Sequence, residues 1–244
     1  MTLRPFWRYF GGKWRAAPRY PAPVHDMIVE PFAGAAGYSL HWQGDFWRRA
    51  VVLVEKNPVI AEVWRYLIAT PSREIAALPA VEHVDDLPSA VPEGARIFIG
   101  LCFGAGDTRP RAAVSPMVRR DGGWSKLRDR AVRQVHRIRH WRIIEGDYTS
   151  APDVIATWFV NPPYQVRGAR DTRPGARGRV RYPCGADELD FEALATWCHA
   201  RHGQVIVCEN EGAVWLPFRS LGVFGAASPG ARSHEVIWTR EGTA

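Results

Sequence analysis

Residues 27–37 read MIVEPFAGAAG, and this stretch predicts the fold class. The run from Met27 to Phe32 is mostly apolar, which is typical of a buried strand. The small residues from Ala33 to Gly37 predict a tight turn that leads into a helix from about Tyr38. A second apolar run, Val51 to Glu55, predicts another strand and ends in an acid. Strand, glycine turn, helix and strand ending in an acid form the first half of a Rossmann-like unit.

The rest of the chain continues this alternation, which predicts an α/β fold with a mostly parallel sheet. Periodicity and turn residues locate the other elements. We expect strands at 142–148, 155–160 and 204–208, helices at 59–69, 124–141 and 188–202, and a closing antiparallel hairpin at 222–227 and 235–239; 96–102 fits a strand or a helix, and 104–123 an irregular loop.

Length and composition indicate one sizeable domain, with or without a small insertion. The chain has 244 residues, of which 46% are apolar, enough for a full core. No apolar run approaches the roughly 20 residues of a membrane span, and the N-terminus lacks the features of a signal peptide. The four cysteines lack the spacing of a metal site, so we expect that they bind no metal. We expect them to be buried free thiols, which fits a reducing cytoplasm. These cysteines are Cys102, Cys184, Cys198 and Cys208.

Two segments carry the positive charge of this basic chain, whose net charge is +7. Residues 107–142 hold eleven Lys or Arg against three Asp, and residues 167–181 hold six Arg against one Asp. They flank the strand at 155–160, so a polyanion is the simplest partner. The alternative is a pair of solvated basic loops. Candidate contacts to bases are Arg109, Arg111, Arg119 and Arg120; Lys126 and the arginines of the 124–141 helix are candidates for phosphate contacts, and Arg167 and Arg170 represent the second segment.

Asn161-Pro162-Pro163-Tyr164 directly follows the strand predicted at 155–160. The Asn161 side-chain oxygen and the Pro162 carbonyl can each accept an N–H from a planar amine, which aims the nitrogen lone pair at an electrophile. Asn161 is neutral and cannot act as a conventional general base. Tyr164 is expected to stack on a nucleobase, which must be flipped out of a duplex to reach the site.

The glycine turn and Glu55 predict a site for a nucleoside. An acid at this strand end can accept both hydroxyls of a ribose, but the Gly-Lys-Ser/Thr of a phosphate loop is absent from the sequence. A cofactor without phosphates fits this pattern best, and S-adenosylmethionine is the obvious one. Asp147 either contacts the adenine or ribose of that cofactor or caps the following turn.

The chain resembles amino-group DNA methyltransferases, most closely the Dam-like, phage-type family specific for adenine N6. The similarity runs from about Arg8 to Thr239 and is weak at 71–141 and 167–181. Five segments carry it: YFGGK at 9–13, EPFAG at 30–34, EGDY at 145–148, NPPY at 161–164 and RSHEVIW at 232–238.

This resemblance implies a Rossmann-like methyltransferase fold and a set of roles. Tyr9 and Lys13 are expected at the methionine end of S-adenosylmethionine, with Lys13 paired to its carboxylate, and Glu55 at the ribose. Asn161 is expected to touch both cofactor and target base. The implied catalytic residues are Asn161, Pro162, Pro163 and Tyr164, and the implied cofactor-binding residues are Tyr9, Lys13, Glu30, Phe32, Ala33, Gly34, Glu55, Asp147 and Asn161.

The family's α arrangement places target recognition between the cofactor and catalytic motifs. It implies a catalytic domain formed by residues 1–103 and 142–244 and a recognition insertion at 104–141. The expected partner is double-stranded DNA, modified in the cytoplasm of a bacterial or phage-infected cell, as in restriction–modification. No feature indicates an obligate protein partner or a membrane, and a monomer is expected.

Asn161 stands where this family usually has Asp, and Glu55 replaces a frequent Asp. N4-cytosine methyltransferases share the Asn161 motif, so cytosine stays an alternative target. RNA or a protein glutamine is a more distant one, since a glutamine amide fits a similar platform. A further alternative is a non-catalytic nucleic-acid-binding protein on a decayed methyltransferase fold.

Overall fold

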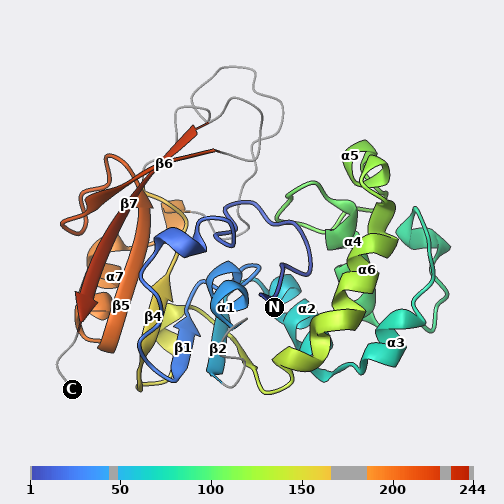
Figure 1. Cartoon of the computed structure of the whole chain (residues 1–244), viewed down its shortest axis with the longest axis horizontal. Helices are drawn as coiled ribbons and strands as arrows, with labels where there is room; N and C mark the ends of the chain where they lie inside the picture. The colour runs from blue at the N-terminus through green and yellow to red at the C-terminus, as the bar shows by residue number, and fades with distance from the viewer. Residues whose placement is uncertain (1, 44–48, 166–185, 226–231, 242–244) are drawn as a thin grey trace.

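The protein is built on one mostly parallel β-sheet (Figure 1). The computed structural model describes residues 2–43, 49–165, 186–225 and 232–241. Within these ranges the sheet has seven strands in the order β3-β2-β1-β4-β5-β7-β6. The first five in this order run parallel, and β7 runs antiparallel to both of its neighbours. The strands are β1 (Met27–Glu30), β2 (Ala50–Glu55), β3 (Arg142–Glu145), β4 (Ile155–Val160), β5 (His202–Asn210), β6 (Arg219–Gly225) and β7 (Arg232–Glu241).

Both faces of the sheet are covered, which is why its central strands are continuously apolar. Ile28 and Val29 of β1 belong to different core clusters, and Phe159 and Trp158 of β4 divide in the same way. Because successive side chains of a strand point to opposite faces, each cluster lies on one side of the sheet. The helices that complete the three layers are α1 (Gly37–Trp42) and α2 (Pro58–Ala69) on the face of Ile28, and α7 (Phe191–His199) on the face of Val29.

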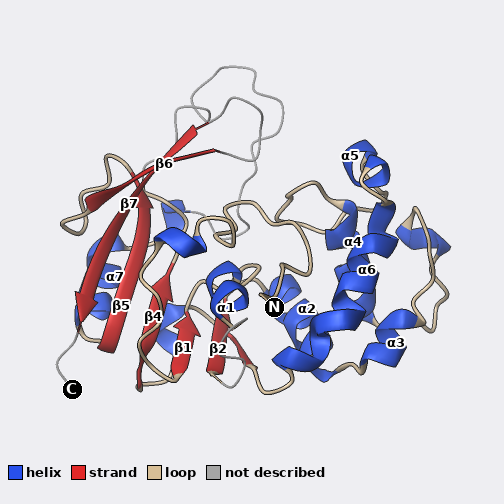
Figure 2. Ribbon diagram, viewed as in Figure 1, coloured by secondary structure: helices blue, strands red, loops and turns tan. Residues whose placement is uncertain are grey.

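A helical lobe lies beside the sheet and is inserted between β2 and β3 (Figure 1). Figure 2 shows the helices of this lobe grouped to one side of the strands. Trp64 of α2, Phe98 of α4 and Trp124 of α6 share one core cluster with the first face of the sheet, so the lobe and the sheet have a continuous core. The lobe contains α3 (Ser72–Ala76), η2 (Val84–Asp86), α4 (Glu93–Phe103), α5 (Pro116–Arg120), α6 (Gly123–Gln134) and η3 (Val135–Ile138).

In this lobe the structure decides one open alternative and corrects one expectation. The segment 96–102 is helical, within α4, and it is apolar on every side because α4 is buried in the middle of the lobe. The irregular loop expected at 104–123 contains α5, which Ser115 caps by accepting a hydrogen bond from Val118 N–H (3.4 Å). Since α3 and α4 both pack on α6, the predicted boundary at Gly104 falls inside the lobe.

The C-terminal hairpin is confirmed as β6 and β7. The last helix begins at Phe191 rather than at Glu188, because Asp190 Oδ1 caps it by accepting the Glu192 and Ala193 amides (3.0 Å each). Among the described residues, no helix is both long and apolar enough to cross a membrane. Three cysteines are buried free thiols, as expected, and Cys184 lies outside the described residues. The remaining short helices are η1 (Ala17–Arg19), η4 (Tyr148–Ser150) and η5 (Ala186–Glu188).

Candidate functional site

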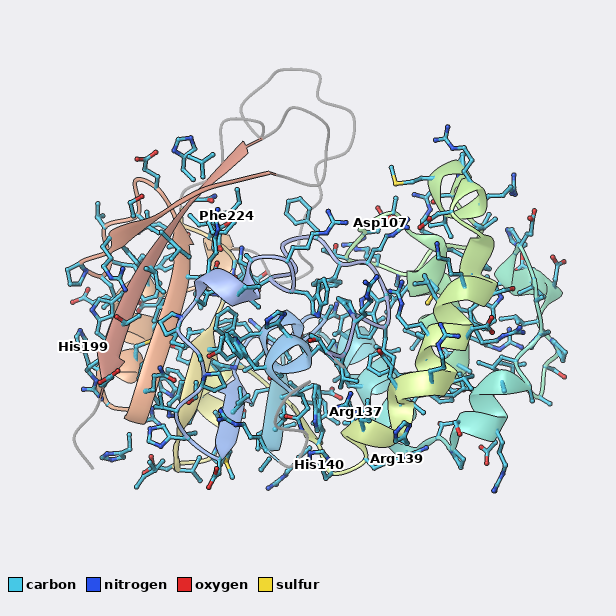
Figure 3. The ribbon with its side chains drawn as sticks, viewed as in Figure 1. Asp107, Arg137, Arg139, His140, His199 and Phe224 are labelled. Atoms are coloured by element: carbon cyan, nitrogen blue, oxygen red, sulfur yellow. The ribbon has the colours of Figure 1, made fainter. Side chains whose placement is uncertain are left out.

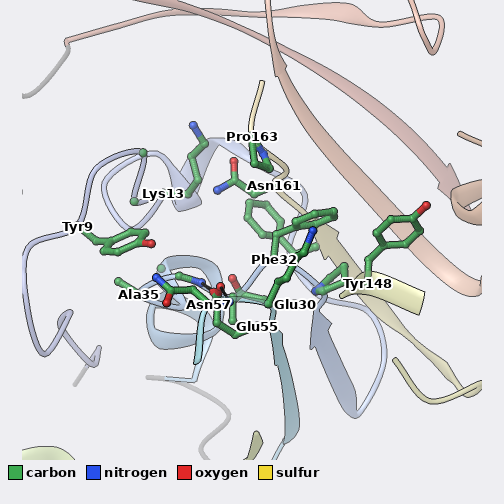
Figure 4. A pocket seen from close by; sticks show the side chains of 18 of the residues that line it. Tyr9, Lys13, Glu30, Phe32, Ala35, Glu55, Asn57, Tyr148, Asn161 and Pro163 are labelled. Carbon is green, nitrogen blue, oxygen red and sulfur yellow. Dashed lines mark hydrogen bonds between the residues drawn. The ribbon is translucent and has the colours of Figure 1, made fainter. Parts of the chain in front are cut away.

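A pocket of about 260 Å³ opens at the carboxyl ends of β1 to β4. Open α/β sheets bind ligands at this edge, where neighbouring connections leave on opposite faces. Here α1 follows β1 on one face and α7 follows β4 on the other. Segments that are distant in the sequence therefore meet around one cavity (Figure 4). They are residues 9–13, the loop after β1, the end of β2, Asp147 and Tyr148, Asn161 and Pro163, and residues 188–190.

The loop after β1 accepts the N-terminal segment, residues 9–14, only because it carries glycines. Gly34 has a φ of +46°, and a Cβ there would lie 2.9 Å from the Tyr9 ring. At Gly37 a Cβ would lie 2.6 Å from the Trp14 backbone nitrogen. Any side chain at either position would push the N-terminal segment away. The glycine turn thus brings Tyr9 and Lys13 to the pocket wall, as expected.

Two carboxylates accept hydrogen bonds from backbone amides in this loop and next to it. Glu30 Oε1 accepts the Ser39 amide of α1 (2.7 Å), and Glu55 Oε2 accepts the Gly34 amide (2.8 Å). Glu55 Oε1 also accepts the Asn57 amide (2.9 Å). The start of a helix after β1 is where phosphates bind in dinucleotide folds, and here the protein's own acids take those donors. Each Glu55 oxygen keeps a second acceptor position for a ligand hydroxyl.

The pocket wall is acidic. Its two lysines are paired: Lys13 Nζ lies 3.2 Å from Glu235 Oε1, and Lys56 Nζ lies 3.4 Å from Glu188 Oε2. Burial raises the pKa of Glu30 to about 7, against the opposing effect of its Ser39 hydrogen bonds. Burial also raises the pKa of Glu55. The acids that line the pocket are Glu30, Glu55, Asp147, Glu188 and Asp190.

Replacing Glu30 with glutamine is expected to change how stability depends on pH. The pKa of Glu30 is raised from 4.5 to about 7, so in this window the folded protein holds a proton that the unfolded chain has released. The free energy of unfolding of the wild type should therefore fall, relative to Glu30→Gln, as pH rises from about 4.5 to 7, by on the order of 3 kcal/mol. Urea denaturation of both proteins across this range measures it; a difference independent of pH would contradict it.

Asn161 begins the loop at the end of β4. Strand β4 is paired on both sides, to β1 and to β5, so this position is rigidly placed. Figure 4 shows the Asn161 amide in the pocket wall, across from Glu55 and Asn57. Within the described residues the half-buried amide has no hydrogen-bond partner. Pro162 is buried and Pro163 lines the pocket. Among the described residues, nothing competes with a ligand for the Asn161 amide.

Lys13 and Tyr164 make contacts inside the protein that the resemblance did not imply. The buried Lys13 ammonium pairs with Glu235 and lies 4.6 Å from the centre of the Tyr164 ring. The Tyr164 hydroxyl donates to Glu235 Oε2 (2.7 Å), and burial raises the pKa of this phenol well above its ordinary value. Lys13 thus has a partner inside the protein and also lines the pocket. Tyr164 is not among the residues lining the pocket.

Asp147 caps the turn after β3, one of its two expected roles. Its Oδ1 accepts the Thr149 amide (2.9 Å), and Asp147 also lines the pocket. The neighbouring Tyr148 stacks on Phe32, with ring centroids 5.7 Å apart, and forms an aromatic wall. Tyr148 and Asn57 line the pocket although neither was predicted. Asn57 caps α2 by accepting the Val59 amide (3.1 Å). The sequence signal for this position is the Asn57-Pro58 pair, a typical helix start, two residues after the strand-end acid Glu55.

Among the residues predicted to contact bases, two are paired with acids. Arg111 lies 3.3 Å from Asp107, and Arg119 lies 2.7 Å from Glu82. Lys126, predicted to contact phosphates, lies 3.1 Å from Asp121. All three pairs are exposed, and such pairs are weak enough to exchange for a phosphate. Arg109 and Arg120 are exposed on the same lobe; Arg167 and Arg170 lie outside the described residues.

Most other arginines of the 124–141 helix correct a prediction, whereas Arg133 is exposed and stays a candidate for phosphate contact. Arg128 donates to the Leu78 carbonyl (2.8 Å), Arg130 to the Pro5 carbonyl (3.0 Å) and Arg139 to the Ile68 carbonyl (2.7 Å). Figure 3 shows Arg137 and Arg139 at the end of the lobe nearest the sheet. These guanidinium groups tie the helix to the rest of the protein instead of pointing to phosphates, because backbone carbonyls lie within their reach.

No model of a known protein family matches the chain, and no curated protein matches its sequence.

Proposed function

We propose that this protein is an S-adenosylmethionine-dependent methyltransferase that modifies the N6 amino group of adenine in DNA. The observation that carries the proposal is the Asn161 amide, unpaired among the described residues. It lies at a strand end in the wall of a pocket where Glu55 already accepts the Gly34 amide of the loop and Glu30 the Ser39 amide of α1. An amine-positioning group thus faces a site unsuited to phosphates.

The fold supports a nucleoside ligand. With β7 set aside, the strand order is 3-2-1-4-5-6, the order of Rossmann folds, and the pocket lies at the switch point between β1 and β4. Glu55 ends β2, the position from which an acid holds a ribose.

The charge of the pocket supports the choice of cofactor. Both lining lysines are paired with acids, whereas Glu55, Asp147 and Asp190 line the cavity without pairing to either lysine. A phosphate would be repelled here, whereas a sulfonium and an ammonium group would be attracted. Glu55 would hold the ribose hydroxyls, and the aromatic wall of Phe32 and Tyr148 would flank the adenine. When bound, S-adenosylmethionine supplies the electrophilic methyl group.

The protein's own part in the reaction is to position the amine. Asn161 Oδ1 and the Pro162 carbonyl each accept one N–H of the base, which favours a pyramidal nitrogen and directs its lone pair toward the methyl donor. Transfer would form the bond from nitrogen to the methyl carbon while the sulfonium–methyl bond breaks and leaves a neutral thioether. The methylated nitrogen would then release a proton to solvent, since the neutral Asn161 cannot take it.

The net charge of +7 and the exposed arginines of α5, Arg119 and Arg120, favour DNA as the substrate. N4-cytosine methylation would use the same platform and is distinguished by experiment.

The test identifies the product. The protein is incubated with S-adenosylmethionine and unmethylated mixed-sequence DNA, and the digested nucleosides are analysed by mass spectrometry, with Asn161→Ala prepared identically as the control for contaminating enzymes. N6-methyladenine from the wild type alone is the expected result. N4-methylcytosine would overturn the choice of base. Cofactor binding without any modified base would favour the non-catalytic alternative.

A further inference from the structure

Glu235 of β7 joins three segments that are distant in the sequence. Its Oε1 pairs with Lys13 (3.2 Å), and its Oε2 accepts the hydroxyls of Tyr164 (2.7 Å) and Tyr20 (3.2 Å). Glu235 is 5% exposed and Lys13 is 7% exposed. The buried ammonium favours the ionised carboxylate, and hydrogen bonds to an ionised acceptor are stronger than those between neutral groups.

A second buried carboxylate holds the next residue of the same loop. Glu209 of β5 is fully buried, and its Oε1 accepts the Gln165 amide. The strands β5 and β7 are paired with Asn210 opposite Glu235. The two acids therefore lie at the same end of the sheet on opposite faces. They hold the consecutive residues Tyr164 and Gln165.

The described start of this loop, residues 161–165, is thus anchored at both ends. Strand β4 fixes the residue before it, Val160, which pairs with Val207. Two prolines stiffen the middle, since each has a fixed φ. The carboxylates of Glu235 and Glu209 fix its far end through Tyr164 and Gln165. Between these anchors the Asn161 amide has no partner of its own among the described residues.

We propose that Glu235 is a positioning residue for the methyl transfer: by holding the Tyr164 hydroxyl it fixes the loop and so aligns the Asn161 amide with the target amine. This inference rests on the proposed function. It assigns Tyr164 an anchoring role through its hydroxyl, and it makes Lys13 the buried counter-charge of Glu235. Displacement of a positioning group by about 1 Å can slow a reaction about 100-fold.

The test compares two tyrosines bound to the same carboxylate oxygen. Tyr164→Phe removes the hydroxyl that anchors the loop, and Tyr20→Phe removes a matched hydroxyl from the N-terminal region. The measurement is the single-turnover rate constant of methyl transfer with enzyme and cofactor saturating, which does not depend on the folded fraction. Tyr164→Phe is expected to slow transfer about 10- to 100-fold and Tyr20→Phe less than about threefold, with the cofactor Kd within about twofold of the wild type in both.

Glu235→Gln provides the second arm. In a wild-type background it should slow transfer at least as much as Tyr164→Phe, and in the Tyr164→Phe background it should add little, because the two changes break one interaction. Glu235→Gln leaves Lys13 buried and unpaired, which can prevent folding. In that case the comparison of Tyr164→Phe with Tyr20→Phe tests the inference by itself. Equal effects of the two tyrosine variants, or an unchanged rate in Tyr164→Phe, would overturn the inference while wild-type activity upholds the proposed function. A wild type that transfers no methyl group would overturn both.

Discussion

Asn161→Ala is expected to reduce the rate of methyl transfer by about 100- to 1000-fold, the usual cost of removing one positioned polar group from a reaction centre. The side-chain oxygen is the acceptor that orients the amine, and the amide has no partner among the described residues whose loss would disturb the fold. The folded state should therefore be preserved, with cofactor affinity changed by less than about tenfold. Single-turnover kinetics and calorimetric titration with S-adenosylmethionine measure the two quantities.

Asn210→Ala is the matched control. Asn210 ends the neighbouring strand β5, and it is not among the residues lining the pocket. The control should retain activity within a few-fold of the wild type. An active Asn161→Ala, or an equal loss in both variants, would rule out Asn161 as the amine-positioning residue.

Glu55→Ala is expected to weaken cofactor binding by at least about 100-fold. The change removes the acceptors proposed for two ribose hydroxyls, and hydrogen bonds to a charged group contribute about 1.5–3 kcal/mol each. It also leaves the Gly34 and Asn57 amides without their carboxylate. The glycine loop should loosen, and the free energy of unfolding should fall by about 1–3 kcal/mol. Calorimetric titration and denaturation measure these effects separately.

The control for this change is Glu145→Ala. Glu145 ends β3 directly opposite Glu55 in the register. It is exposed, pairs with Arg65 and is not among the pocket-lining residues. Its removal should leave cofactor affinity within about twofold of the wild type, as expected for an exposed ion pair. Unchanged affinity in Glu55→Ala would exclude Glu55 from the cofactor site.

The main elements of the fold could be predicted because their signals are local. Apolar runs mark β1, β2 and β4, and small residues mark the turn after β1. The carboxyl ends of parallel strands meet at one edge. That rule predicts that Glu55 and Asn161 share one site, and the resemblance adds Glu30; all three line the same pocket in the structure.

In the helical lobe, local sequence patterns were not enough to predict the structure. α4 is buried on all sides, so its apolar run carries no helical period, and a buried strand would look the same. The arginines of α6 look like a basic surface in the sequence. Arg128 and Arg130 instead reach carbonyls 50 and 125 residues away, which no local pattern records.

The sequence alone determines the strands, the glycine turn and the position of Asn161 at the end of β4. It can do so because periodicity, turn geometry and strand order are properties of neighbouring residues. Only the tertiary structure decides which charges face the pocket and which face each other. Lys13 and Glu235 are 222 residues apart, yet they form a buried pair. A buried charge must find a partner, and the fold alone determines which one lies within reach.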